Sequence, residues 1–197
     1  MAVLYYELQP RPELVRKVNL GPFEISQDDG LPLRKAAFTA LDTVMTSDKL
    51  ADRVGAEIVP LLCGCVVTAA RRTAPPAPSP PRIAHSLLRS GLRDNDEVKV
   101  ICHGLITKLV ASPSWQAFLI ADLNSISAAL VVALEPSKEA PSADIVRSTL
   151  RTINAIQSSC TEAMSVPLFA VLATRCERTD TALAPIMAQI RSEAGRF

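Results

Sequence analysis

The side chains best able to bind a metal or act as nucleophiles are five cysteines and two histidines. Cys63 and Cys65 are separated by one glycine, but no second Cys or His pair follows at the spacing that a zinc site needs. Cys102 and His103 are a thiol beside an imidazole, yet neighbouring residues on a helix point about 100° apart and do not face each other. We interpret these residues as small side chains in buried helices, and we expect neither a metal site nor catalysis.

Motifs that would indicate an enzyme or a nucleic-acid-binding protein are missing from the sequence. It contains no Gly-rich phosphate loop, no Gly-x-Ser-x-Gly turn and no paired-carboxylate signature. Lys plus Arg total 21 against 20 for Asp plus Glu, so no overall field favours DNA, RNA or an anionic membrane. The sequence therefore predicts a noncatalytic protein without a cofactor, whose partners are recognised by local surface.

The stretch from 71 to 93 combines prolines with arginines. Its proline-rich part, 73–82, predicts an extended loop insertion and contains two weak Pro-x-x-Pro matches. No acidic residue and no aromatic residue lies in the stretch, which leaves binding to an acidic protein or nucleic acid open, although a solvated loop is the simpler interpretation. The arginines are Arg71, Arg72, Arg82, Arg89 and Arg93.

The distribution of cysteines and apolar residues indicates an intracellular protein. The cysteines form an odd set scattered through apolar segments, as reduced thiols do. The first residues lack the basic start and long apolar run of a signal peptide. The most apolar stretches, 58–70 and 117–134, contain Pro60 and Asp122 respectively, and neither resembles the ~20 apolar residues of a membrane-spanning helix. We therefore expect no membrane contact.

The composition favours packed helices in a single domain spanning residues 1–197. Apolar residues make up 48% of the chain and aromatic residues only 4%, which suits helix-on-helix packing better than a sandwich of strands. The chain length is typical of one domain. Helical periodicity predicts helices at 31–45, in part of 48–70, and at 83–91, 95–111, 117–134, 142–158, 162–174 and 178–193.

Three segments share a sequence pattern in which a capping residue stands five positions before a cation. Each cation follows an aliphatic residue and begins a strongly apolar helix, as in the second helix of a HEAT repeat. Without the proline-rich insertion, their spacing approaches the repeat length of about 40 to 47 residues. The sequence therefore predicts an all-α fold, a HEAT-repeat α-solenoid. The three pairs are Asp29 and Arg34, Asp94 and Lys99, and Ser142 and Arg147.

The segment 13–27 departs from the helical pattern. Apolar and polar residues alternate there on both sides of Gly21 and Pro22, which predicts a short β-hairpin near the N-terminus. The apolar face of such a hairpin either folds back onto the helices or projects from the solenoid and contacts a partner. We expect a projecting hairpin.

The run from 14 to 38 carries a family resemblance. Its specific strings are Gly-Pro-Phe at 21–23, Asp-Asp-Gly-Leu at 28–31 and Arg-Lys-Ala-Ala-Phe at 34–38. The run closely resembles the C-terminal HEAT domain of the Cand family, the cullin-associated, neddylation-dissociated exchange factors. That domain is also called the TATA-binding-protein-interacting domain. Weaker similarity at 90–99 and 145–150 extends the resemblance over most of residues 4–160.

The resemblance implies a function for the hairpin. In that family the C-terminal repeats hold the N-terminal helical domain of a cullin, and a projecting hairpin occupies the place of a substrate-receptor adaptor. The chain is thus expected to be a noncatalytic cullin-binding regulator of cullin-RING ubiquitin ligase assembly that competes with adaptors. We expect apolar anchors and basic guides among the contact residues. These residues, by position, are Arg16, Lys17, Val18, Asn19, Leu20, Gly21, Pro22, Phe23 and Glu24.

The same resemblance leaves other functions and partners open. The family's second name implies a transcription-linked scaffold that binds TATA-binding protein, for which the basic stretch is the only other support. A Cand protein is a long solenoid, and this chain resembles only its last repeats. We therefore expect either an N-terminal Cand chain that completes the solenoid or a fragment that merely folds. The expected location is the nucleus and cytoplasm.

Overall fold

The computed structural model describes residues 6–47, 55, 57–63, 86–135 and 141–195. Helices dominate this part of the chain, and the only strands within it form a hairpin before the first long helix. In order, the elements are η1 (Pro12–Leu14), β1 (Val15–Leu20), β2 (Phe23–Asp28), α2 (Leu31–Thr46), α4 (Leu87–Gly91), α5 (Asp96–Ala111), α6 (Pro113–Leu134), α7 (Ala143–Ser159), η2 (Thr161–Ser165), α8 (Pro167–Thr174), η3 (Arg175–Thr179) and α9 (Leu183–Ala194).

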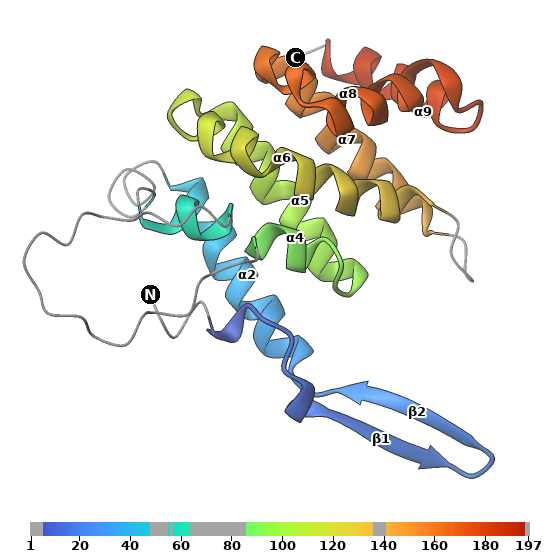
Figure 1. Ribbon diagram of the computed structural model, residues 1–197. Helices are drawn as coiled ribbons and strands as arrows, with labels where there is room; N and C mark the ends of the chain where they lie inside the picture. Colours follow the sequence, from blue (N-terminus) through green and yellow to red (C-terminus); the bar gives the residue numbers. More distant parts are fainter. Residues whose placement is uncertain (1–5, 48–54, 56, 64–85, 136–140, 196–197) are drawn as a thin grey trace, which may run out of the picture.

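The helices stack in two layers (Figure 1). Helices α2, α5, α7 and α9 contact one another in succession and form one layer, while α4, α6 and α8 form the other. Contacts of α5 with α4 and α6, and of α6 with α7, join the layers. This succession of helical pairs is the expected HEAT-type solenoid, and the expected hairpin precedes it.

Side-chain caps explain where several helices begin. The Ser142 hydroxyl accepts a hydrogen bond from the Ile145 amide at 3.3 Å, so that the expected cap of α7 is confirmed. The other two expected caps were wrong by one residue. The N-cap of α5 is Asn95, whose side chain accepts from the Glu97 amide at 3.1 Å, and the N-cap position of α2 is Gly30.

The carboxylates expected to cap α2 and α5 have other partners. Asp94 binds the guanidinium of Arg34 and the Asn95 amide rather than an amide in the first turn of α5. Asp29 binds the side chains of Arg16 and Gln27, while Asp28 accepts from the Gly30 amide at 2.9 Å. Because an aspartate beside a helix start can bond either a free amide or a nearby cation, the sequence pattern alone did not separate the two roles.

Three of the expected helices differ from the structure by more than one residue. Helix α6 begins at Pro113 rather than at 117, because proline is well suited to a first helical turn whose amides have no partner inside the helix. The expected helix 162–174 is divided into η2 and α8 at Pro167, and the expected helix 178–193 starts only at Leu183 after the π-helix η3. Of the expected helix at 83–91, the structure describes residues 86–91, and α4 spans Leu87–Gly91.

One continuous apolar core runs through the stack, from Leu8, which precedes η1, to Ile190 in α9. Its largest fully buried side chains include Phe38 and Phe169. Helix α6 lies within this stack and packs against α4, α5, α7 and α8. By length and composition alone α6 is apolar enough to cross a membrane, a test that buried helices of soluble proteins also pass.

The expected proline-rich insertion at 73–82 lies outside the described residues, as do Arg71, Arg72 and Arg82. The described residues on either side of this part of the chain lie close together. The Ser86 hydroxyl donates a hydrogen bond to the Leu62 carbonyl at 2.8 Å, which joins the helical residues 57–62 to the start of α4. Residue 86 therefore lies beside the end of the helical residues 57–62.

Candidate partner-binding hairpin

The hairpin is a two-stranded antiparallel ribbon with a two-residue turn. Its register pairs Val15 with Asp28 at the base and Leu20 with Phe23 at the tip. Gly21 has a φ of 70°, the left-handed conformation that two-residue hairpin turns require at their first central position. Figure 1 shows the ribbon extending beyond the start of α2, away from α7, α8 and α9.

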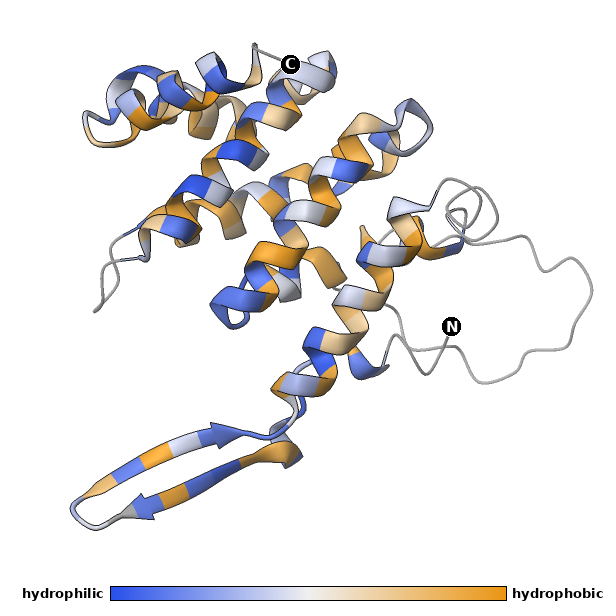
Figure 2. Cartoon of the chain, turned by 180° about the vertical axis from the view of Figure 1, so that it is seen from behind, coloured by the Kyte–Doolittle hydropathy of each residue, from blue (hydrophilic) through white to orange (hydrophobic). Residues whose placement is uncertain are grey.

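One face of the ribbon is apolar and faces solvent. Directly paired residues share a face, so Val18 and Ile25 lie on the same side as Phe23. Phe23 is 71% exposed and Ile25 is 46% exposed, while Val18, directly opposite Ile25, is half-buried. Figure 2 shows apolar and polar residues alternating along both strands. The exposed apolar side chains on this face make it a candidate contact surface for another molecule.

The expected polar contact residues lie on this ribbon with partners inside the chain. Arg16 forms an ion pair with Asp29 at 2.8 Å, and Lys17 forms one with Glu24 at 3.0 Å. These exposed pairs contribute little to stability. Asn19, Gly21 and Pro22 are exposed at the outer part of the ribbon.

Sequence reasoning missed two parts of this site. Ile25 lies one residue beyond the expected contact range, although the alternation of apolar residues that predicted the hairpin continues through it. The root of the hairpin depends on Arg34, which was read only as the cation of a helix pattern. No sequence signal connects Arg34 with Asp94, because the two residues are 60 positions apart.

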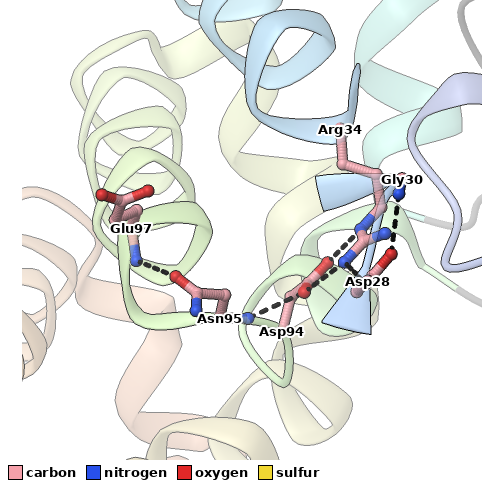
Figure 3. A network of polar contacts seen from close by, with 6 residues as sticks. All are labelled: Asp28, Gly30, Arg34, Asp94, Asn95 and Glu97. Carbon is pink, nitrogen blue, oxygen red and sulfur yellow. Dashed lines mark hydrogen bonds and ion pairs between the residues drawn. The ribbon is translucent and has the colours of Figure 1, made fainter. Parts of the chain in front are cut away.

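Arg34 joins three segments at the root of the hairpin (Figure 3). Its Nη2 donates to Asp28 at the end of β2 at 2.7 Å, and its Nε and Nη2 donate to the two Asp94 oxygens at 2.6 and 2.8 Å. The Asn95 amide also donates to Asp94 at 2.7 Å. Arg34 is only 3% exposed, so these charged hydrogen bonds are shielded from water.

The charges in this network stabilise one another. The hydrogen bonds that Arg34 donates to Asp94 raise the pKa of Arg34, so that its guanidinium stays charged. The hydrogen bond from Arg34 in turn holds the pKa of Asp28 below its ordinary value, despite an opposing effect of burial. Arg34 and Asp28 are therefore both ionised near neutral pH.

The residues first considered for chemistry are packing residues. Cys102 lies beside Gly91 of α4, whereas the His103 ring lies 2.9 Å from the Ser148 hydroxyl on α7. The thiol and the imidazole therefore contact different helices. Burial raises the pKa of the Cys102 thiol, which disfavours the reactive thiolate. Cys65 lies outside the described residues, within which no group of three or more His, Cys, Asp or Glu side chains is placed to hold a metal ion.

Comparison with known proteins identifies relatives of this chain. The family model "TATA-binding protein interacting (TIP20)" matches residues 1–177. Cullin-associated NEDD8-dissociated protein 1 of Arabidopsis thaliana is 31% identical over 164 residues, which is 79% of this chain and 11% of that protein. The Dictyostelium discoideum protein of the same name is 28% identical over 113 residues, or 57% of this chain and 7% of that protein.

A third relative is named only as part of a protein. It is "Cullin-associated NEDD8-dissociated protein 1, C-terminal part" of Emericella nidulans, 26% identical over 108 residues, which cover 53% of this chain and 7% of the relative. The chain thus spans about a tenth or less of the length of the relatives that it matches.

The fold and the hairpin define a HEAT-type solenoid with an exposed apolar ribbon at one end, an architecture that presents extended surfaces to partners. The family match covers most of this chain. The chain belongs to the TATA-binding protein interacting (TIP20) family and corresponds to the C-terminal part of the cullin-associated NEDD8-dissociated proteins, so the resemblance seen in the sequence is confirmed.

Proposed function

We propose that this chain is a noncatalytic regulator that binds the N-terminal helical domain of a cullin, competes there with substrate-receptor adaptors, and acts in the nucleus and cytoplasm. The observation that carries the proposal is the exposed apolar face of the hairpin, with Phe23 at its tip. The cullin-associated names of the relatives support this choice of partner.

The shape of the ribbon suits competition for a binding site. A two-stranded hairpin in water is marginally stable and gains from packing its apolar face against another surface. Phe23 is an aromatic side chain at the tip, the type of residue that often dominates binding energy at interfaces. The helical layers would contact the side of the cullin domain, and the ribbon would occupy the space that an adaptor needs.

The test is a binding titration with purified cullin N-terminal domain. The change Phe23→Asp should weaken binding about thirtyfold or more, the loss expected for an interface residue worth about 2 kcal/mol. A matched control is Val171→Asp on α8, which is 67% exposed and lies far along the stack. Equal affinity of the Phe23→Asp and wild-type chains would overturn the proposed role of the hairpin.

Competition needs a separate measurement. A labelled adaptor bound to the same cullin domain should be displaced by the wild-type chain in proportion to its concentration, but not by Phe23→Asp. Simultaneous binding of the adaptor and the chain would contradict competition and leave only cullin binding.

An N-terminal Cand chain that completes the solenoid is a further proposed partner. Leu33, Ala36 and Ala40 are exposed at helical spacing on α2, and Leu33 is 49% exposed. Such a row of apolar and small side chains suits a preceding helical pair. Co-expression with an N-terminal Cand region should yield a complex that Leu33→Glu weakens, and failure of the wild-type chain to form one would overturn this proposal.

The alternative is a transcription-linked scaffold that binds TATA-binding protein. Its support is the description of the family, while most of the basic stretch first considered for this role lies outside the described residues. Binding of purified TATA-binding protein, together with no binding of cullin domains, would favour the alternative.

A further inference from the structure

We propose that Arg34 is a positioning residue, which fixes the direction of the hairpin relative to the helical layers by bridging Asp28 and Asp94. The inference concerns the orientation of the hairpin. Only its consequence for partner binding rests on the proposed function.

The hairpin and its connection to α2 form a closed unit at the root. The Asp29 amide donates to the Leu14 carbonyl at 3.0 Å, which continues the strand pairing one step beyond Val15 and Asp28. The Asp29 side chain binds Arg16 and Gln27 from the two strands. These contacts hold the strands together, but they all lie within the hairpin unit and do not join it to a helix side chain.

Arg34 supplies the connection to the helices. In the described part of the chain, Asp28 is the strand residue that bonds to a helix side chain, and its partner is Arg34. The same guanidinium binds Asp94 with two hydrogen bonds, and Asp94 stands just before α5. The two hydrogen bonds to Asp94 fix the plane of the guanidinium. The Asp28 carboxylate is fixed as well, because one oxygen accepts from Arg34 and the other from the Gly30 amide.

Gly30 leaves the space in which this bridge forms. An added Cβ there would lie 3.0 Å from Leu14 Cδ1, 3.2 Å from Asp28 Oδ1 and 3.3 Å from Arg34 Nη1. Three neighbours at this separation would need to shift together. The close approach of the hairpin root to α2 therefore depends on a residue without a side chain at the joint.

The orientation of the hairpin has a direct consequence for partner binding. A ribbon that samples many directions presents its apolar face correctly only part of the time, and the apparent affinity falls by the same fraction. If the competent fraction falls to about a tenth, binding weakens about tenfold with no contact residue changed.

The test measures residual dipolar couplings of backbone amides in the ¹⁵N-labelled full chain. In the wild type, amides of 15–28 and of α5 and α7 should fit one alignment tensor. In Asp28→Asn, which keeps Asp94 bound to Arg34, and in Arg34→Lys, which lacks the planar fork, the hairpin's order relative to the helices should drop below about 0.6, the range of a flexible segment. The couplings within α5 and α7 should stay unchanged.

The control is Lys35→Met. Lys35 pairs with Glu97 and so also joins α2 to α5, but this ion pair does not include a hairpin residue. Its loss should leave all couplings unchanged, so a general weakening of the α2–α5 contact is separated from loss of the bridge. If Arg34→Lys fails to fold, because a buried carboxylate loses its partner, Asp28→Asn decides the question.

The outcomes separate this inference from the proposed function. Hairpin couplings that stay at wild-type size in a folded Asp28→Asn chain would overturn the positioning role. Reduced couplings with a lower cullin affinity support the positioning role and its consequence. Reduced couplings with unchanged cullin affinity support the positioning role and instead overturn the hairpin as the cullin contact.

Discussion

His103 shows how one buried ionisable side chain contributes to this solenoid. It is 2% exposed at the α5–α7 contact, with Nδ1 2.9 Å from the Ser148 hydroxyl and Nε2 3.5 Å from that of Thr149. Burial, helped by the nearby charge of Lys99, lowers the pKa of His103 to about 4. The ring is therefore neutral at physiological pH and packs as a polar but uncharged group.

This shift predicts a loss of stability in mild acid. Between pH 6.5 and pH 4 the unfolded chain binds a proton at His103 that the folded chain excludes, so the free energy of unfolding decreases as the pH falls. From pH 7 to pH 5 the decrease should be about 2 kcal/mol. Urea unfolding of the wild type and of His103→Gln at several pH values measures this, and parallel curves for the two proteins would show that His103 does not titrate as described.

At the scale of elements, the turn of the hairpin is a point where one residue type is required. Gly21 has positive φ and nothing within 4 Å of an added Cβ, so the change Gly21→Ala should act only through backbone strain. A residue with a Cβ in this conformation costs about 1 to 2 kcal/mol. We expect amides of 15–28 to exchange faster with solvent while the thermal midpoint of the helices stays constant. Unchanged exchange in the hairpin would mean that the turn relaxes without strain.

Gly91 lies where α2, α4 and α5 meet, and an added side chain there would overpack this contact. An added Cβ would collide with Cys102 Sγ and lie 2.8 Å from Phe38 Cζ, and both side chains are fully buried. The change Gly91→Ala should destabilise the chain by about 1 to 3 kcal/mol, measured by urea unfolding. Gly104→Ala in α5 is the matched control, because its Cβ would meet only Asp42 Oδ1 at 3.6 Å. That change should stabilise the helix by about 0.5 to 1 kcal/mol, and equal effects of the two changes would contradict the packing argument.

Element boundaries were predictable where local chemistry decides them. Helices α2, α5 and α7 begin and end within one residue of the expected positions, because a polar or glycine-containing segment precedes each apolar periodic run. The division of the expected helix 162–174 was missed because Ala163, Met164 and Val166 carry the apolar pattern up to Pro167, although the Val166 backbone is extended. Periodicity alone does not show such a break.

The strands of the candidate site could be predicted from the sequence, but the contacts at the root of the hairpin could not. Alternation around Gly21 and Pro22 is a local signal, and it gave the hairpin. The bridge through Arg34 depends on the stacking of α2 beside α5, which only the tertiary fold supplies. The similar cation Lys99 pairs at 2.7 Å with Asp96 of its own helix, so residues that share one sequence pattern have different partners.

At the scale of the whole molecule, α9 joins the stack beyond the part matched by the family model, which ends at residue 177. Leu183, Met187 and Ile190 of this helix are buried in the common core. Arg191 bonds to Asn154 and to Gln157 on α7, and it also pairs with Glu177. Burial alone would raise the pKa of Glu177, but hydrogen bonds from Gln157 and Arg191 lower it. Helix α9 thus packs against α7 and extends the layer formed by α2, α5 and α7.

Removal of α9 tests how far a local loss of packing destabilises the rest of the stack. A chain that ends after Thr179 lacks the three buried side chains Leu183, Met187 and Ile190, each worth about 1.5 to 3 kcal/mol, so it should lose about 5 kcal/mol or more of stability. Because each helical pair contacts only its neighbours, hydrogen exchange should increase most in α7 and α8 and least in α2. The control is Arg191→Met, which removes only exposed polar contacts and should cost less than about 1 kcal/mol. If the shortened chain unfolds at the same urea concentration as the full chain, α9 lies outside the cooperative unit and its packing on α7 does not stabilise the solenoid.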